Sequence, residues 1–220
     1  MTTGFECRAV LFDMDGTLVD STAISEGIWR DWAAGAGVDP EPILAIHHGR
    51  RPEESLSLTY PGHATAENAA WVQTQGAVRR IGLLPIPGAA ALLAALCDCP
   101  WAVVTSATRE LAVARLKAVD LWREILVIGA EEVTVGKSSP EGYLAAARRL
   151  GVPPESCLVL EDAPAGIQAG RAAGMTVIGV LSTHGAGELE TPHLIDNYLG
   201  ATVEPLPNGG FRVSLPVVSA

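Results

Sequence analysis

The stretch AVLFDMDGT, residues 9–17, places an apolar run before two aspartates, Asp13 and Asp15, and ends in Gly16 and Thr17. A continuous apolar run of this kind is typical of a buried strand in a parallel sheet. Ligands of open α/β sheets bind just beyond the carboxyl ends of the strands, so we expect both carboxylates at the mouth of a site. Their side chains should point the same way, because side chains alternate along an extended chain.

Two carboxylates this close repel each other unless a cation neutralises them. Mg2+ prefers oxygen ligands and is the natural neutralising ion. The pair Asp13 and Asp15 therefore predicts a nucleophile and an acid/base beside a metal. A structural interpretation stays open on this stretch alone, because Asp-Gly is a common turn pair and an aspartate that ends a strand can cap the following loop.

From Leu84 onward, short apolar strands alternate with amphipathic or Ala-rich helices, which is typical of repeated βα units around a parallel sheet. The expected strands are 101–104, 125–128, 157–160 and 176–180, and the expected helices are 88–96, 109–119, 140–150 and 164–173. Residues 202–215 predict a hairpin of two short strands around the turn sequence Asn208-Gly209-Gly210. The expected fold class is therefore α/β, with a doubly wound, Rossmann-like parallel-sheet core.

Residues 19–83 break this alternation, because they carry helical patterns and no convincing strand. One predicted helix face carries Ile24, Ile28, Trp29 and Trp32, and another carries Ala69, Val72, Gln73 and Gly76. We interpret the segment as a small all-helical cap domain inserted into a discontinuous core of residues 1–18 and 84–220, which includes the C-terminal hairpin. Core packing is the favoured role of the two tryptophans, with a place in a sugar-binding cleft as the alternative.

The 220 residues are 48% hydrophobic and carry a net charge of -10, which allows one sizeable core and disfavours a nucleic-acid partner. The amino terminus lacks the basic and apolar regions of a signal peptide, and no apolar run approaches the roughly 18 residues of a membrane span. We therefore expect a cytoplasmic protein that does not bind membranes. The cysteines show no CxxC spacing and are interpreted as reduced packing residues: Cys7, Cys97, Cys99 and Cys157.

Polar residues also stand at three later junctions of the predicted core. Thr105 and Ser106 offer hydroxyls to phosphate oxygens, although a hydroxyl at such a junction is often only a helix N-cap. Lys137 precedes a predicted helix, where its ammonium group can bind a phosphate or remain solvated. Glu161 and Asp162 follow another strand and can bind a metal or cap the next helix. Each of these signals is weak alone. The evidence for a common site is the order in which they follow one another along the chain.

In that order the sequence resembles the haloacid dehalogenase-like hydrolase superfamily, and in particular its sugar phosphatases of the beta-phosphoglucomutase-like subgroup with a helical cap. The likeness covers nearly the whole chain. Residues 13–21 are similar to the family's first motif, Thr105 or Ser106 to the second, Lys137 to the third and Glu161-Asp162 to the fourth. The chain departs from many relatives at Ser138-Ser139, where they carry proline after the lysine.

The resemblance implies a Mg2+-dependent phosphatase that hydrolyses sugar phosphates through an aspartyl-phosphate. Asp13 would attack phosphorus, and Asp15 would protonate the leaving alkoxide and then deprotonate the hydrolytic water. Mg2+ would be held by the side chains of Asp13 and Asp162 and by the carbonyl oxygen of Asp15. The resemblance assigns the phosphate oxygens to Gly16, Thr105, Ser106 and Lys137, and gives Glu161 an orienting role behind the metal.

The cap would select the substrate, a small phosphorylated sugar, through His48, Gly49 and Arg50, which stand where the family places its specificity loop. For the pair His47 and His48, packing at the surface or hinge is an equal alternative. The pair has no cysteine or carboxylate at metal-ligand spacing, so a zinc site is not expected.

The main alternative function is a hexose-phosphate mutase of the same family, because residues 50–56 have some likeness to the mutase cap loop. A dehalogenase would leave Asp15 without a role, and a phosphonate hydrolase needs a cap lysine, which residues 19–83 lack. A non-catalytic ligand-binding protein, the remaining alternative, would be expected to have lost Asp13, Asp15 or Asp162. The sequence therefore favours the phosphatase.

Overall fold

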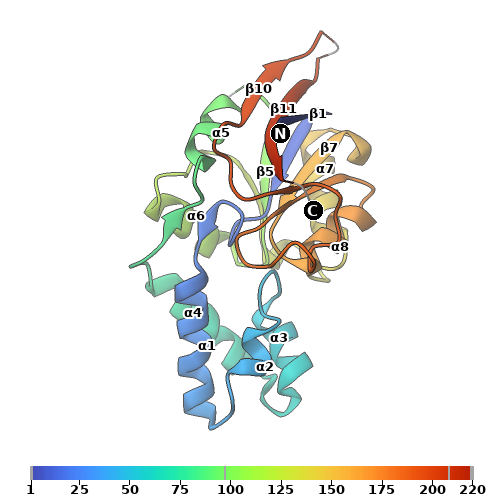
Figure 1. The fold of residues 1–220 in the computed structure, drawn as a ribbon. Helices are drawn as coiled ribbons and strands as arrows, with labels where there is room; N and C mark the ends of the chain where they lie inside the picture. The colour runs from blue at the N-terminus through green and yellow to red at the C-terminus, as the bar shows by residue number, and fades with distance from the viewer. Residues whose placement is uncertain (1, 97, 208, 219–220) are drawn as a thin grey trace.

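A parallel sheet at the centre of the molecule decides where the site lies (Figure 1). The computed structural model describes residues 2–96, 98–207 and 209–218, so the predictions for Cys97 and Asn208 lie outside the described residues. The parallel strands are, in spatial order, β9 (Leu194–Ile195), β8 (Thr176–Val180), β7 (Cys157–Glu161), β2 (Ala9–Phe12), β5 (Trp101–Val104) and β6 (Leu126–Ile128). The predicted core strands are thus present, with bounds that differ by at most one residue.

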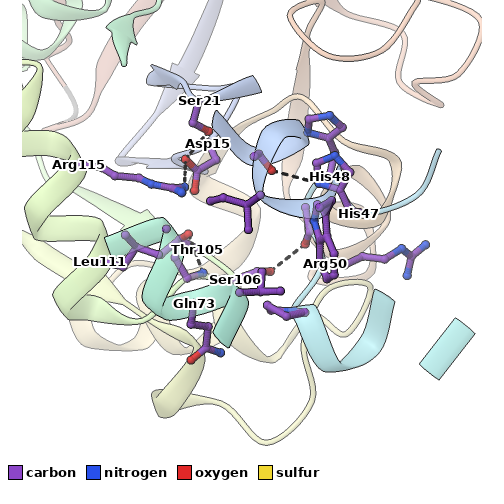
Figure 2. A pocket seen from close by; sticks show the side chains of 18 of the residues that line it. Asp15, Ser21, His47, His48, Arg50, Gln73, Thr105, Ser106, Leu111 and Arg115 are labelled. Carbon is purple, nitrogen blue, oxygen red and sulfur yellow. Dashed lines mark hydrogen bonds and ion pairs between the residues drawn. The ribbon is translucent and has the colours of Figure 1, made fainter. Parts of the chain in front are cut away.

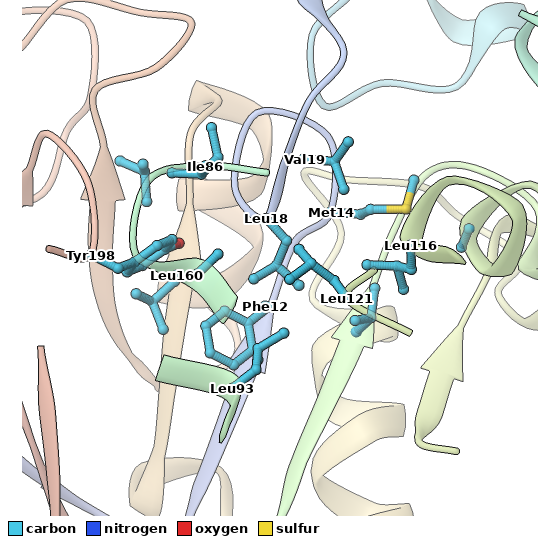
Figure 3. Packing of buried hydrophobic residues seen from close by; sticks show 14 of the residues in the cluster. Phe12, Met14, Leu18, Val19, Ile86, Leu93, Leu116, Leu121, Leu160 and Tyr198 are labelled. Carbon is cyan, nitrogen blue, oxygen red and sulfur yellow. The ribbon is translucent and has the colours of Figure 1, made fainter. Parts of the chain in front are cut away.

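Side chains of the central strand β2 alternate between two apolar cores. Val10 and Phe12 belong to one core, and Ala9 and Leu11 belong to the other. The helices α5 (Ala89–Ala95) and α6 (Arg109–Ala118) contribute to the first core, and α7 (Glu141–Leu150) and α8 (Pro164–Ala172) contribute to the second. Figure 3 shows Phe12 of the first core packed near Leu93 of α5 and Leu160 of β7. Helices on both faces confirm the doubly wound α/β fold.

The sheet continues antiparallel beyond β9, which the sequence predicted only in part. Strand β11 (Phe211–Val218) pairs with β9, with β10 (Thr202–Pro205) and with β1 (Thr2–Cys7). The predicted hairpin corresponds to β10 and β11, although β11 runs three residues past position 215. Strand β1 was missed, because its sequence TTGFEC has few apolar residues and its partner Phe211–Pro216 lies at the far end of the chain.

A helical layer, residues 22–78, lies between β2 and β5 in sequence and forms a separate body in Figure 1. It consists of α1 (Thr22–Ala36), α2 (Glu41–Leu44), α3 (Pro52–Thr59), the 3-10 turn η1 (Pro61–His63) and α4 (Ala66–Val78). Further 3-10 turns in the core are η2 (Ala130–Glu132) and η3 (Pro154–Ser156). Within the ranges that the structure describes, no helix combines the length and apolarity needed to cross a membrane.

The two chain segments that lead into and out of the helical layer pair with each other. Strand β3 (Val19–Asp20) is antiparallel to β4 (Leu84–Pro85). The expectation of no strand within 19–83 was therefore wrong at Val19–Asp20. A two-residue pairing leaves no alternating pattern in the sequence, and its partner is more than sixty residues away.

Two buried thiols give a first testable prediction. Cys7 and Cys157 are free and buried. Burial raises the pKa of Cys7 to about 12 and that of Cys157 to about 11, so the reactive thiolate is scarce near neutral pH. We expect iodoacetamide at pH 8 to label both at least about a hundredfold more slowly in the native protein than in guanidinium. Peptide mapping measures the two rates, and equal rates would contradict the burial.

Candidate active site

The site lies beyond the carboxyl end of β2. At β2 the order in which successive strands are added to the sheet changes from one side to the other. From β2 the chain moves to β5 and β6 on one side, then crosses back to β7 on the other side and continues to β8. Ligands of doubly wound sheets bind at such a switch point. Asp13 follows β2 directly and is 3% exposed, and Glu161 ends the neighbouring strand β7. The two predicted acidic motifs therefore meet at one edge of the sheet.

Lys137 connects these two motifs. Its Nζ donates hydrogen bonds to Asp13 Oδ1 and to Glu161 Oε1, both at 2.5 Å, and the residue is 8% exposed. Burial alone would lower the pKa of Lys137, but the charges of Asp13 and Glu161 outweigh it and raise this pKa above its ordinary value. The alternative of a solvated lysine was therefore wrong.

Glu161 has its hydrogen-bonding capacity filled by the protein. Besides Lys137, its Oε1 accepts from the hydroxyl of Tyr143 at 3.1 Å. Its Oε2 accepts from the backbone N–H groups of Asp162 and Ala163, at 2.9 and 3.1 Å. These contacts hold the loop after β7 in place. A carboxylate so occupied fits the predicted orienting role better than direct ligation.

Three buried carboxylates form a cluster in which a metal ion could bind. Ligand oxygens of Asp13, Glu161 and Asp162 lie within 4.8 Å of one another. Oδ2 of Asp13 is buried and has no hydrogen-bond partner. Burial raises the pKa of Asp13 to about 7 against the opposing charge of Lys137, and burial followed by the charges of Glu161 and Asp13 raises that of Asp162. An unpaired buried carboxylate oxygen among carboxylates suits a hard cation.

The loop after β2 is shaped around Asp162. Gly16 has a φ of +86°, and a side chain there would collide with the carboxylate of Asp162. Hydroxyls of Thr17 and Thr183 donate to the two oxygens of Asp162, that of Thr17 at 3.1 Å. The N–H of Gly16 donates to the carbonyl of Val19 at 2.7 Å, so Gly16 is part of the turn, and its assignment to phosphate stays a prediction.

Asp15 contacts a different set of side chains from those around Asp13. Its Oδ1 accepts from the hydroxyl of Ser21 at 2.7 Å and forms an ion pair with Arg115 of α6. Arg115 was missed by the sequence analysis. The available signal was its position four residues after Leu111, which places a charged residue on the buried face of α6.

Both aspartates line a cavity between the helical layer and the sheet. Figure 2 shows Asp15 in its wall. The core side supplies Asp13, Asp15, Thr105, Ser106 and Arg115. The predicted specificity residues all line it as well: His48, Gly49 and Arg50. Trp29 lines the cavity and also packs edge-on against Trp32 at a ring distance of 5.7 Å, so packing and cleft lining are combined in Trp29.

The hydroxyls after β5 do not cap α6. The N-cap is Thr108, whose side chain accepts from the N–H of Leu111 at 3.3 Å, so the capping alternative for Thr105 and Ser106 was wrong. Thr105 accepts from the N–H of Ala107 at 3.1 Å. Both hydroxyls are thus placed at the cavity wall, close to the end of the sheet.

The loop between α2 and α3 is fixed on the core. Ser106 Oγ donates to the carbonyl of Gly49 at 2.8 Å. Nη2 of Arg51 donates to the carbonyls of Ala130 and Val133, both at 2.9 Å. These contacts hold residues 47–50 in the wall of the cavity, on the side of the helical layer.

The histidine pair forms part of the cavity wall, with His47 buried and His48 half-buried. The rings of His47 and His48 lie 4.0 Å apart, and the rings of His48 and His184 lie 5.7 Å apart. Burial lowers the pKa of His47 to about 3 and that of His48 to about 4, so both are neutral near pH 7. Because both histidines are neutral, the charges that line the cavity come from its aspartates and arginines.

Comparison with known proteins agrees with this geometry. Residues 7–174 match the family described as haloacid dehalogenase-like hydrolase. The chain belongs to this hydrolase family. The chain is also similar to hexitol phosphatase A of Escherichia coli (strain K12), with 40% identity over an alignment of 209 residues that covers 92% of this chain and 97% of that protein.

Solved structures of two other proteins share the fold. A hydrolase from Pseudomonas syringae superposes with a TM-score of 0.77 at 27% identity, covering 86% of this chain and 93% of that one. A putative beta-phosphoglucomutase from Thermotoga maritima superposes with a TM-score of 0.65 at 26% identity, covering 86% and 94%. The resemblance stated from the four motifs is therefore confirmed.

Proposed function

We propose that this hydrolase is a Mg2+-dependent phosphatase of sugar phosphates that works through an aspartyl-phosphate on Asp13. One observation carries the proposal. Asp13 stands at the end of the central strand with one carboxylate oxygen on Lys137 and the other without a partner, in the same cavity as Asp15. This is the arrangement that a covalent nucleophile with a nearby acid/base requires.

In the proposed first step the Asp13 carboxylate attacks phosphorus, and the bond from phosphorus to the sugar oxygen breaks. Asp15 gives its proton to that oxygen. In the second step water attacks the aspartyl-phosphate, its proton passes to Asp15, and phosphate leaves as Asp13 is restored. Lys137, with the hydroxyl of Thr105, would stabilise the charge on the transferred oxygens, and the hydroxyl of Ser106 would join them after leaving the carbonyl of Gly49.

The donor set fits Mg2+, because buried carboxylate oxygens are the ligands this ion prefers. The side chains of Asp13 and Asp162 and the carbonyl of Asp15 would hold it. When bound, the ion offsets the repulsion between the carboxylates and the phosphate.

Residues 19–83 would act as the cap over a core of residues 1–18 and 84–220, and the cavity between them would hold the sugar. The 40% identity to a hexitol phosphatase favours a polyol or hexose phosphate as substrate. His48, Gly49 and Arg50 would contact it from the cap. The free thiols of Cys7 and Cys157 fit the cytoplasm as its compartment.

The test is release of inorganic phosphate from a panel of hexitol, hexose and pentose phosphates, with Mg2+ and after its removal by EDTA. We expect release from at least one hexitol or hexose phosphate, loss of nearly all of it in EDTA, and recovery when Mg2+ is added back. No release with any panel member, together with isomerisation of a hexose phosphate, would replace the phosphatase by the mutase.

A further inference from the structure

Arg115 is a buried cation that the proposed mechanism leaves without a role. It projects from α6, is 7% exposed, and forms its ion pair with Asp15. Figure 2 shows its side chain reaching Asp15 at the cavity wall, on the opposite side from Arg50. Burying a guanidinium costs several kcal/mol unless it is well paired. The presence of a buried arginine at this position therefore calls for an explanation.

The fold makes room for Arg115 from two sides. On α6 it shares the buried face with Leu111 and Leu116. On α4 of the helical layer, a Cβ added at Gly76 would lie 3.2 Å from Nη2 of Arg115, so the guanidinium lies close against that helix. The side chain is thus held between a core helix and the helical layer, with its charged end directed at the acid/base.

The hydrogen bonds on Asp15 are concentrated on one oxygen. Oδ1 accepts both from Ser21 and from Arg115. An oxygen that already accepts two donors is a poor place for a proton, because the proton would face N–H and O–H groups. The other oxygen, Oδ2, is then the atom that can carry the proton toward the cavity.

We infer that Arg115 is a positioning residue, which together with Ser21 fixes Oδ1 of Asp15 so that Oδ2 gives and takes the proton during hydrolysis. The inference rests on the proposed function. Each aspartate of the pair then has its own cation: Lys137 serves the nucleophile Asp13, and Arg115 serves the acid/base Asp15.

The two chemical steps separate this role from a purely structural one. A sugar leaves as an alkoxide and needs the proton of Asp15, whereas 2,4-dinitrophenolate leaves without a proton. The later attack of water needs Asp15 as the base for either substrate. Loss of Arg115 should therefore slow sugar phosphate turnover and the water step, but spare phosphoryl transfer from 2,4-dinitrophenyl phosphate to Asp13.

The experiment is stopped-flow and steady-state kinetics of Arg115→Met with a hexitol phosphate and with 2,4-dinitrophenyl phosphate. We expect kcat for the hexitol phosphate to fall about 10²-fold. The variant should still release one dinitrophenolate per enzyme in a burst, at a rate within about threefold of the unsubstituted protein, before a slow steady state. Arg115→Lys should recover part of the turnover, because lysine can keep the ion pair as a point charge.

Ser21→Ala is a second, milder variant, and it carries the test if Arg115→Met does not fold. It removes the other donor to the same oxygen and should slow the steady state without slowing the burst. Arg109→Met is the matched control, because Arg109 lies on the same helix and donates instead to the carbonyl of Val127 at 3.1 Å. It should leave both phases unchanged.

Equal slowing of burst and steady state in both Arg115→Met and Ser21→Ala would overturn the inference, since a structural defect affects both steps. A raised KM at unchanged kcat would also overturn it, by making Arg115 a substrate contact. An unsubstituted protein that neither hydrolyses any sugar phosphate nor shows a burst would overturn the proposed function itself.

Discussion

Asp13→Asn is expected to abolish phosphate release while the fold is retained. The amide has the shape of the carboxylate but does not attack phosphorus, so no aspartyl-phosphate forms. Removal of a catalytic nucleophile lowers kcat by roughly 10⁵- to 10⁶-fold. Lys137 keeps its 2.5 Å hydrogen bond to Glu161, so the buried cation remains paired in the variant.

Acid quenching with a 32P-labelled hexitol phosphate measures the intermediate directly. The unsubstituted protein should retain acid-stable label on the peptide that contains Asp13, and Asp13→Asn should retain none. Asp31→Asn is a matched control, because Asp31 is an exposed carboxylate of α1 that pairs with Arg79 at 2.8 Å. Label on the Asp13→Asn protein, or hydrolysis near the normal rate, would contradict a nucleophilic Asp13.

Much of the core could be predicted because its strands are buried on both faces. Residues 9–12 and 101–104 are buried along their whole length, and such strands read as continuous apolar runs in the sequence. The helices between them carry the usual start and stop residues; α7, for example, follows Pro140 and ends before Gly151, which has a φ of +68°. Local chemistry was sufficient for these elements.

Elements that depend on distant partners could not be predicted in this way. Cys7 pairs with Phe211, and Val19 pairs with Pro85, so β1 and β3 exist because of residues far along the chain. Neither strand has an apolar run of its own. The spacing of hydrophobic residues indicates which face of an element is buried. It does not indicate which strand pairs with that element.

The same distinction holds in the site. The sequence predicted that Asp13 and Glu161 lie together, because the topology of a parallel sheet brings the carboxyl ends of its strands together. Lys137, predicted in a loop before a helix, contacts both. Arg115 lies one hundred residues from Asp15 in the chain and on a helix, where an arginine is ordinarily solvated. Its contact with Asp15 follows from the packing of α6 and α4, which no local pattern reports.

Lys137→Met is expected to remove activity and to destabilise the fold by about 3–5 kcal/mol, the cost of breaking a buried ion pair. It would leave the carboxylates of Asp13 and Glu161, both buried, with no cation between them. For a chain of this size the loss corresponds to a fall in Tm of roughly 6–20 °C. Thermal unfolding followed by circular dichroism measures it.

The chain offers a close control, because its two lysines are Lys117 and Lys137. Lys117 is exposed on α6 and stands 5.9 Å from the centre of the Trp122 ring, so Lys117→Met should change stability by no more than about 0.5 kcal/mol. If repulsion among the buried carboxylates causes the loss, Glu161→Gln added to Lys137→Met should restore part of the stability, because the cluster then carries one negative charge fewer. A further fall in Tm in the double variant would mean that Lys137 contributes through packing and that the charge balance at the end of β2 is not what holds the site together.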